Sequence, residues 1–466
     1  MEKTTVAWNK VKTVKWAINI ILPALILLIP INEAFTHDIL LFMALTIFLI
    51  ALIATDNIPV PAVALLMPVA YIVIMKVPPG TAFGAWAQPV PWLVFGAFII
   101  SFALEKTGLI RRIALRCIIT IGCNYGGIIY GMLLSGTILS LVISDPSAKA
   151  VLLGSLALSI CKILKLELGG KVASGIGLSA LIAMLNPGMF FMHGSTNIIF
   201  PMGITAGLGL AQPSWLAFLI HMFVPQLIFT LLCMLVIQFM YKPGHALVGS
   251  RERLRQELKD LGSMSLAEKK LAVISGLLII AVVTSSLHGI AIAWLFIIAA
   301  ILLLWPGIMV VEHKEVAQCN IPFIVFIASC LSIGLVSSHF GVGKYLGETL
   351  TPMIAGSLRQ TYGGVWVFGF ISNFLLTPLA AYSAFTEPVV RIAESLSINA
   401  MPLVYTFAVS LEQVVFAYEF IPVLMLFGFG MISFKNMVIF NIIKSVLCFL
   451  CILLVYTTWW SIIGIL

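Results

Sequence analysis

The sequence predicts an all-α polytopic membrane protein with about eleven transmembrane helices and two re-entrant hairpins. Of the 466 residues, 61% are hydrophobic and only 9% are charged, and the mean hydropathy is +1.13. A soluble domain carries about 25% charged residues. Near-continuous apolar runs recur along the chain, at 18–30, 39–54 and 271–285 among others. A charged motif that occurs twice within this apolar background adds a functional hypothesis to the fold prediction.

The net charge of +8 does not indicate nucleic-acid binding, because the basic residues lie at the ends of apolar runs. Residues 242–270 form the one long polar segment, with seven Lys/Arg against four Asp/Glu. The positive-inside rule therefore places this segment and the amino terminus in the cytoplasm. The first 15 residues lack a signal-peptide cleavage pattern. We expect an integral protein of a bacterial inner membrane, in contact with the lipid bilayer. Four lysines precede the first span: Lys3, Lys10, Lys12 and Lys15.

The order of apolar segments gives the expected elements. Two apolar regions, each centred on an acid-proline motif, return to the side from which they enter, which predicts re-entrant hairpins at 122–162 and 362–397. Crossing counts make the first hairpin enter from the cytoplasm and the second from the opposite side. The expected full spans include 16–32, 39–54, 58–76, 92–106, 172–200, 214–240, 271–287, 290–305 and 321–340.

The two parts of the chain resemble each other. The segment 92–97 is similar in position and texture to 322–327, and each precedes a hairpin region and then a polar, broken span. Opposed hairpins in two such halves predict inverted-topology repeats. The expected division is a first repeat at 1–241, a cytoplasmic polar linker at 242–270 and a second repeat at 271–466.

The recurring charged motif reads hydroxyl, acid, proline, two spacers, base. It occurs as Ser144-Asp145-Pro146 with Lys149, and as Thr386-Glu387-Pro388 with Arg391. Proline suits the first turn of a helix and the residues before it are good caps, so each motif predicts a helix start in mid-membrane. Free N–H groups at such a start attract anions. Each base follows its acid by four residues and can meet it on one helix face, so the alternative is a pair of structural ion pairs.

Two broken spans add polar groups. In the first, Ser195, Thr196 and Asn197 follow His193, which is a candidate proton carrier or a hydrogen-bonded core histidine. In the second, acids lie in the apolar run without a nearby base, as candidate proton or cation ligands or as partners of distant bases. These acids are Glu412 and Glu419.

On these elements, the chain resembles the divalent anion/sodium symporter family from about residue 15 onward. The resemblance implies eleven spans, two opposed hairpins, a homodimer, an elevator-like motion and carriage of di- or tricarboxylates. It also implies substrate and sodium binding at Ser-Asn-Thr motifs on the hairpin tips. The matching positions are Ser144-Asp145-Pro146, Thr386-Glu387-Pro388 and, in the broken fifth span, Ser195-Thr196-Asn197.

The departures from that pattern set up two hypotheses. Acids stand where the family has Asn, and prolines stand where it has Thr. In one hypothesis Lys149 and Arg391 replace two sodium ions, and transport is coupled either by exchange of anions or by protons carried on Glu419 or His193. In the other, Asp145 and Glu387 strengthen sodium binding and the bases contact the substrate. No cofactor beyond a sodium coupling ion is expected, and no metal site.

The main rival function is a cation/proton antiporter that uses Asp145, Glu387 and Glu419 and carries no organic anion. An enzyme is not expected, because no H-E-x-x-H motif is present and Ser147 and Lys149 do not face each other on a helix. The sequence therefore favours a secondary active transporter of small organic anions.

Overall fold

The computed structural model describes all residues except 1–9, 56, 245–249 and 320. Lys3 and part of the polar linker lie outside the described residues. Every regular element in the described residues is helical. The helices of the amino-terminal part are α1 Lys10–Leu27, α2 His37–Thr55, α3 Val60–Met75, α4 Pro79–Ala82, η1 Gly84–Ala87, α5 Pro89–Thr107, α6 Leu109–Ile121, α7 Tyr125–Ser140, α8 Pro146–Ile163, α9 Lys171–Leu185, η2 Asn186–Met189, α10 Thr196–Gly207 and α11 Trp215–Met240.

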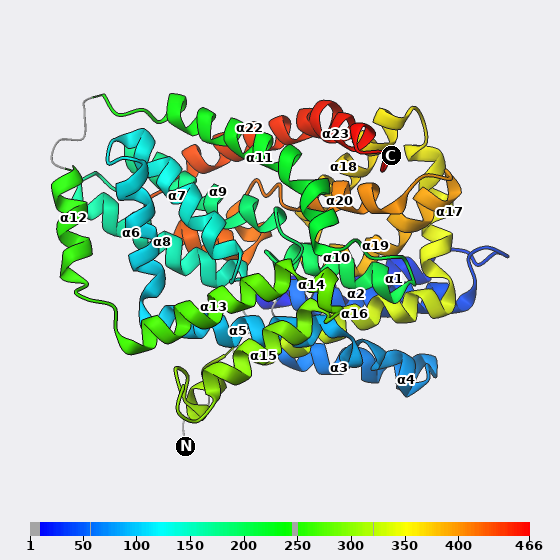
Figure 1. Ribbon diagram of the computed structural model, residues 1–466. Coiled ribbons are helices and arrows are strands. Elements are labelled where there is room, and N and C mark those ends of the chain that lie inside the picture. Colours follow the sequence, from blue (N-terminus) through cyan, green and yellow to red (C-terminus); the bar gives the residue numbers. More distant parts are fainter. Residues whose placement is uncertain (1–9, 56, 245–249, 320) are drawn as a thin grey trace, which may run out of the picture.

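The carboxy-terminal part follows a similar succession of long, short and broken helices (Figure 1). Its elements are α12 Ser250–Asp260, α13 Leu266–Val283, α14 Ser285–His288, α15 Ile292–Leu304, η3 His313–Gln318, α16 Ile321–Phe340, α17 Val342–Ile354, α18 Leu358–Leu375, α19 Pro378–Ser395, α20 Ala400–Leu411, η4 Ala417–Glu419, α21 Ile421–Gly428, α22 Phe434–Cys451, η5 Ile452–Tyr456 and α23 Thr457–Ile462.

Length and composition agree with a membrane protein. Within the described residues, 6 helical stretches are long and apolar enough to cross a bilayer, and further apolar helices are shorter. Helix α11 exposes one stripe of large apolar side chains, as a lipid-facing helix does. The predicted class, an all-α polytopic membrane protein, is confirmed. The exposed residues on α11 are Leu216, Ile220, Ile228, Leu231, Leu235 and Phe239.

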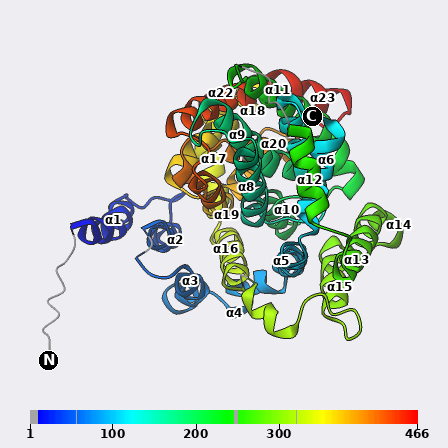
Figure 2. The same ribbon diagram turned by 90° about the vertical axis from the view of Figure 1, so that its left-hand side faces the viewer.

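The helices form a large bundle with two flanking groups. Figure 2 shows α1, α2 and α3 to the left of the bundle and α13, α14 and α15 at its lower right. Helices α5 and α16 lie between these groups: α16 packs on α3, and α15 packs on α5. The bundle itself contains α6–α11, which follow α5, and α17–α23, which follow α16. The apolar side chains of α2, α3 and α16 form a separate core cluster, so the first flanking group has its own packing unit.

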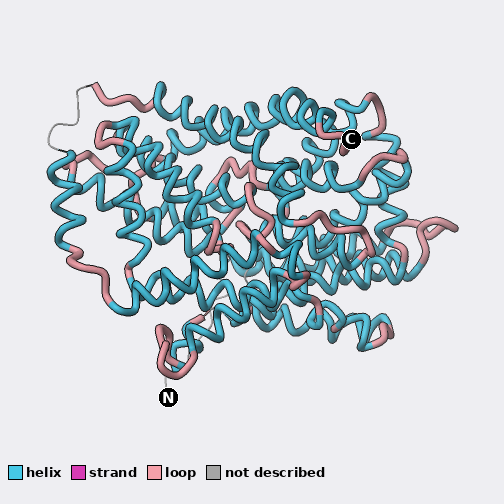
Figure 3. Tube along the Cα trace, viewed as in Figure 1, coloured by secondary structure: helices cyan, strands magenta, loops and turns pink. Residues whose placement is uncertain are grey.

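Non-helical backbone lies in the middle of the molecule, among the helices (Figure 3). Residues 141–145 join α7 to α8, and residues 376–377 join α18 to α19. Residues 190–195 separate η2 from α10, and residues 412–416 separate α20 from η4. Non-helical backbone at such depth is tolerated only where protein or a cavity surrounds it. We call the first two segments the hairpin tips and the last two the helix breaks.

The first hairpin tip agrees with the sequence and the second does not. Helix α8 begins at Pro146 with Asp145 as its N-cap, as predicted. Helix α19, however, begins at Pro378 after Thr377, and Pro388 lies inside it. The prediction of a helix start at Thr386-Glu387-Pro388 is therefore wrong. The physical reason is that an earlier Thr-Pro pair starts the helix, and a transmembrane helix tolerates a later proline in its interior.

The polar linker is anchored by one buried arginine. Within the polar segment 242–270, helix α12 ends at Asp260, because Gly262 has φ +66° and Ser265 caps a new helix, α13. Arg112 on α6 donates through Nε to the Glu268 carboxylate at 2.9 Å. Its two other nitrogens donate to the carbonyls of Gly262 and Leu261, at 2.7 and 3.1 Å. One side chain thus joins α6 to the turn between α12 and α13.

Close packing of α5 on α15 depends on a glycine. A Cβ atom at Gly96 would lie 2.7 Å from the backbone carbonyl carbon of Phe296 and 2.8 Å from its oxygen. We expect Gly96→Val to lower the free energy of unfolding by about 1–3 kcal/mol, because backbone atoms cannot move aside cheaply. Thermal unfolding in detergent measures this change. Gly80→Val is the control, since no atom lies within 4 Å of its Cβ position; equal shifts for both variants would contradict the argument.

Candidate functional site

A cavity of about 400 Å³ lies where the two hairpin tips and the two helix breaks meet. Its lining includes first-turn or capping residues of four helices: α8, α10, α19 and α21. Each helix start presents the positive end of a helix dipole, and at α8 and α10 the first N–H groups bond to Asp145, Ser144 and Ser195. Four such ends around one cavity favour a bound anion. The residues are Asp145, Pro146 and Ser147; Thr196 and Asn197; Thr377, Pro378 and Leu379; and Glu419, Phe420, Ile421 and Pro422.

The opposite wall of the cavity is apolar. It comes from α2, α3 and α16, which belong to the first flanking group and its neighbour. These helices contribute aliphatic, aromatic and proline side chains, which offer no hydrogen bonds to a ligand. The polar contacts with a ligand must therefore come from the tips and breaks. The wall residues are Ile53, Val60, Pro61, Pro322, Phe323 and Phe326.

Hydrogen bonds tie the first tip to the first break. The Ser144 hydroxyl donates to the carbonyl of His193, and the Ser144 carbonyl accepts from the N–H of Thr196 at 2.9 Å. The Asp145 carboxylate accepts the N–H groups of Ser147 and Ala148, both at 3.0 Å. Ser195 caps α10 by accepting the N–H of Asn197. The sequence-predicted residues of the first motif and of the first break thus form one unit.

The side chain of Lys149, on α8, also bonds to this unit. It is 1% exposed, and its Nζ donates to the Gly194 carbonyl at 3.0 Å and to the Ser140 hydroxyl at 3.2 Å. No ion pair joins Lys149 to Asp145 among the described residues, so the predicted pairing on one helix face is wrong. The reason is that the Asp145 carboxylate is occupied by backbone N–H groups, while the unwound break offers the ammonium two oxygen acceptors.

The second tip and the second break are joined in a comparable way. The Glu419 carboxylate accepts the N–H groups of Val415 at 3.1 Å and Phe416 at 2.9 Å. Asn373, near the end of α18, also donates to this carboxylate, at 3.5 Å. Glu419 is thus buried as a structural acceptor that also lines the cavity.

One side-chain bond connects the two breaks. Asn197 Nδ2 donates to Glu412 Oε1 at 2.6 Å, between α10 and the end of α20. Lys444 on α22 donates to the backbone carbonyl of Glu412 at 2.7 Å. Asn197 Oδ1 and Glu412 Oε2 are buried and have no hydrogen-bond partner among the described residues. Both breaks therefore carry polar groups that a ligand or ion can satisfy.

The second charged motif lies away from the cavity. The Glu387 carboxylate on α19 accepts a hydrogen bond from Ser337 on α16 at 3.0 Å. It also pairs with Arg391, on its own helix, at 3.3 Å. Arg391 is partly exposed and also pairs with Glu394 at 2.9 Å. None of Thr386, Glu387, Pro388 and Arg391 is among the described residues that line the cavity. The contacts of Arg391 are those of the structural ion-pair alternative, and the hypothesis that it replaces a sodium ion stays a prediction.

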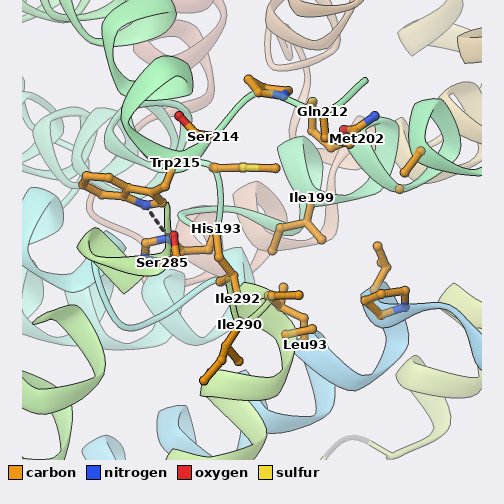
Figure 4. A pocket seen from close by; sticks show the side chains of 18 of the residues that line it. Leu93, His193, Ile199, Met202, Gln212, Ser214, Trp215, Ser285, Ile290 and Ile292 are labelled. Carbon is orange, nitrogen blue, oxygen red and sulfur yellow. Dashed lines mark hydrogen bonds between the residues drawn. The ribbon is translucent and has the colours of Figure 1, made fainter. Parts of the chain in front are cut away.

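His193 lies at a second, apolar cavity of about 390 Å³ between α10, the start of α11, α5 and α14–α15. Figure 4 shows aliphatic side chains around it and the bond from Trp215 to His193. Trp215 Nε1 donates to His193 Nδ1 at 3.1 Å, which leaves Nε2 to donate to the Leu141 carbonyl at 3.0 Å. With both ring nitrogens engaged, His193 fits the hydrogen-bonded core alternative. The cavity lining labelled in Figure 4 includes Leu93, Ile199, Met202, Ile290 and Ile292.

Sequence reasoning missed three residues of this region. Asn373 and Thr377 precede the second helix start, and a hydroxyl directly before Pro378 is the same cap signal that identified Asp145. Lys444 is an isolated base within the apolar run 437–456, where a charge marks a functional hypothesis.

Comparison with known proteins gives membrane proteins, several of which are named as dicarboxylate transporters. Dicarboxylate transporter 1, chloroplastic, from Spinacia oleracea is 23% identical over 479 residues, covering 96% of this chain and 81% of the relative. The sodium-dependent dicarboxylate transporter SdcS of Staphylococcus saprophyticus is 23% identical over 447 residues, covering 85% and 81%. A protein described as a membrane protein in Cupriavidus necator is 25% identical over 302 residues, and this match spans 58% of its length.

Residues 10–466 match the family described as the sodium:sulfate symporter transmembrane region. This match covers nearly the whole chain and includes both tips, both breaks and the cavity between them. The chain therefore belongs to the sodium:sulfate symporter transmembrane family, as an integral membrane transporter and not an enzyme.

Proposed function

We propose that this protein carries small dicarboxylate anions across the membrane by secondary active transport. The observation that carries the proposal is the convergence of four helix starts on one buried cavity of about 400 Å³. The positive dipole ends of these four helices attract the two carboxylates, with Thr196, Asn197 and Thr377 as side-chain contacts. The relatives named as dicarboxylate transporters support this substrate class.

The two unlike walls of the cavity support an elevator-type motion. The polar wall belongs to tips and breaks that are tied together by hydrogen bonds, and it moves as one body. The apolar wall offers a smooth surface along which that body slides. In this proposal the flanking helices α1–α3 and α13–α15 stay with the bilayer and with a second copy of the chain in a homodimer.

The order of elements supports two inverted repeats. A group of flanking helices, one long helix, one amphipathic helix, a hairpin and a broken helix occur before the linker and again after it. We place α12 and the basic linker in the cytoplasm, together with the amino terminus. The first hairpin then opens to the cytoplasm and the second to the other side of a bacterial inner membrane.

Sodium is the proposed coupling ion. Around the second break, the formal charges of Glu412, Glu419 and Lys444 sum to −1, so one monovalent cation would neutralise this group. Unpartnered buried oxygens lie on Glu412, Gln413 and Asn373 and can ligate a hard cation. The name of the staphylococcal relative also supports sodium dependence.

Uptake of labelled succinate and malate into proteoliposomes tests the proposal. The four conditions are with and without an inward sodium gradient, and with and without internal unlabelled dicarboxylate. We expect saturable uptake that increases with the sodium gradient. Uptake that needs internal dicarboxylate and ignores sodium would replace symport with exchange. Cation-driven proton movement without any uptake of dicarboxylate would favour the cation/proton antiporter.

A further inference from the structure

We propose that Lys149 is a tethered cation that permanently occupies the cation position of the first break, so that only the second break binds a coupling ion. This inference rests on the proposed anion transport and adds the number of cations that accompany the anion. It differs from the hypothesis of two fixed cations at Lys149 and Arg391 in that Arg391, which lies elsewhere, takes no part.

The ammonium of Lys149 lies inside the unwound segment. A Cβ atom at Gly188 would be 3.1 Å from Lys149 Nζ and 3.1 Å from the Gly194 carbonyl oxygen, so the Nζ fills the space between the two sides of the break. Its acceptors are one backbone carbonyl of the unwound chain and one hydroxyl, on Gly194 and Ser140. Unwound carbonyls in broken helices are the ligands that membrane transporters use for sodium.

Burial of the Lys149 ammonium costs desolvation free energy, which its surroundings must offset. Lys149 is 1% exposed, and a buried ammonium is retained only where oxygen acceptors or countercharges compensate for its desolvation. The break supplies those acceptors, as it would for a metal cation. Lys162 lies on the same helix and is exposed, so the helix as such does not dictate a buried base.

Each break holds a buried lysine on a backbone carbonyl, Lys149 on Gly194 and Lys444 on Glu412, so the breaks differ in their net charge and not in the presence of a base. At the first break Asp145 and Lys149 sum to zero formal charge. At the second break Glu412, Glu419 and Lys444 sum to −1. The unpartnered oxygens follow the same asymmetry: those of the region gather around the second break, on Glu412, Gln413, Asn373 and Asn441, whereas Asn197 Oδ1 is the one at the first break among the described residues.

The number of coupling cations is tested by succinate uptake as a function of sodium concentration, with choline as the replacement ion. For the wild type and for the control Lys162→Ala we expect a hyperbolic dependence, with a Hill coefficient of about 1. In Lys149→Ala, uptake at low sodium should fall about 10-fold or more. Methylammonium should restore this uptake, and so should high sodium, with a sigmoidal dependence of uptake on sodium concentration. A sigmoidal sodium dependence of the wild type, or a Lys149→Ala variant that behaves like the wild type, would overturn the inference.

A second measurement separates this inference from the proposed function. Methylammonium should raise the thermal unfolding temperature of Lys149→Ala in detergent, but not that of the wild type or Lys162→Ala. If no protein transports a dicarboxylate, the proposed function fails, and this shift still decides the role of Lys149. If Lys149→Ala does not fold, Lys149→Met keeps the length of the side chain; it should fail to transport and resist rescue, and full uptake by it would refute the inference.

Discussion

Asn197→Ala is expected to reduce dicarboxylate uptake by about 10- to 100-fold. The Asn197 side chain lines the cavity and supplies the 2.6 Å hydrogen bond to Glu412, the direct link between the two breaks. Its removal leaves the Glu412 carboxylate buried without a side-chain donor, since Glu412 Oε2 has no partner among the described residues. The free energy of unfolding should fall by about 1–3 kcal/mol for the same reason. Uptake in proteoliposomes and thermal unfolding in detergent measure the two effects.

A double-mutant cycle separates stability from transport. Glu412→Ala combined with Asn197→Ala removes the unpaired carboxylate, so unfolding should return toward the wild-type value while uptake stays low. The control is Asn399→Ala, which removes the N-cap of α20 and a bond to the Ile465 carbonyl, away from the cavity. If Asn399→Ala lost as much uptake as Asn197→Ala, the loss would reflect stability alone, and the role assigned to Asn197 would be wrong.

Arg112→Met is expected to be the most destabilising single substitution, with a loss of about 3–5 kcal/mol in the free energy of unfolding. Arg112 and Glu268 form a buried pair at 2.9 Å, and the guanidinium also satisfies two carbonyls of the linker turn. Methionine preserves much of the volume but leaves the Glu268 carboxylate buried with the loss of a charged donor. Thermal unfolding in detergent, or expression level, measures the loss.

A second, compensating substitution at Glu268 should restore stability. Arg112→Met combined with Glu268→Leu removes both charges and should recover most of the loss, because a well-packed apolar pair replaces a buried ion pair at little cost. Arg116→Met is the matched control, since Arg116 lies on the same helix and is exposed. A large loss in Arg116→Met, or none in Arg112→Met, would contradict this account.

Local rules predicted the first hairpin tip because they act within a few residues. Asp145 before Pro146 is a cap followed by a proline, and that pair alone determines where α8 starts. The same rule applies to Thr377 before Pro378, where α19 begins, whereas the predicted start is Thr386-Glu387-Pro388, which matches the first motif. Two segments with similar sequences can differ in backbone conformation. A helix that has already begun continues through a later proline when neighbouring helices support it.

The partners of the charged side chains could not be read from spacing. Lys149 lies four residues after Asp145, yet its ammonium bonds to the Gly194 carbonyl, 45 positions away in the chain. Glu412 meets Asn197 across 215 positions. Such contacts depend on how the two breaks pack together, and sequence periodicity carries no information on that packing. Arg391 and Glu387, in contrast, do form the pair that their spacing predicts.

The hydrocarbon character of the wall formed by α2, α3 and α16 has an electrostatic consequence. A cargo that passes this surface exchanges water for a medium of low polarisability, and the self-energy of an uncompensated ion rises by several kcal/mol there. Passage is then limited to combinations of cargo and carrier that are close to neutral overall. Leakage of a lone ion is suppressed by the same energy, without any gate that must close. In the proposed transport cycle, the six apolar side chains of this wall therefore favour a fixed ratio of cations to anions.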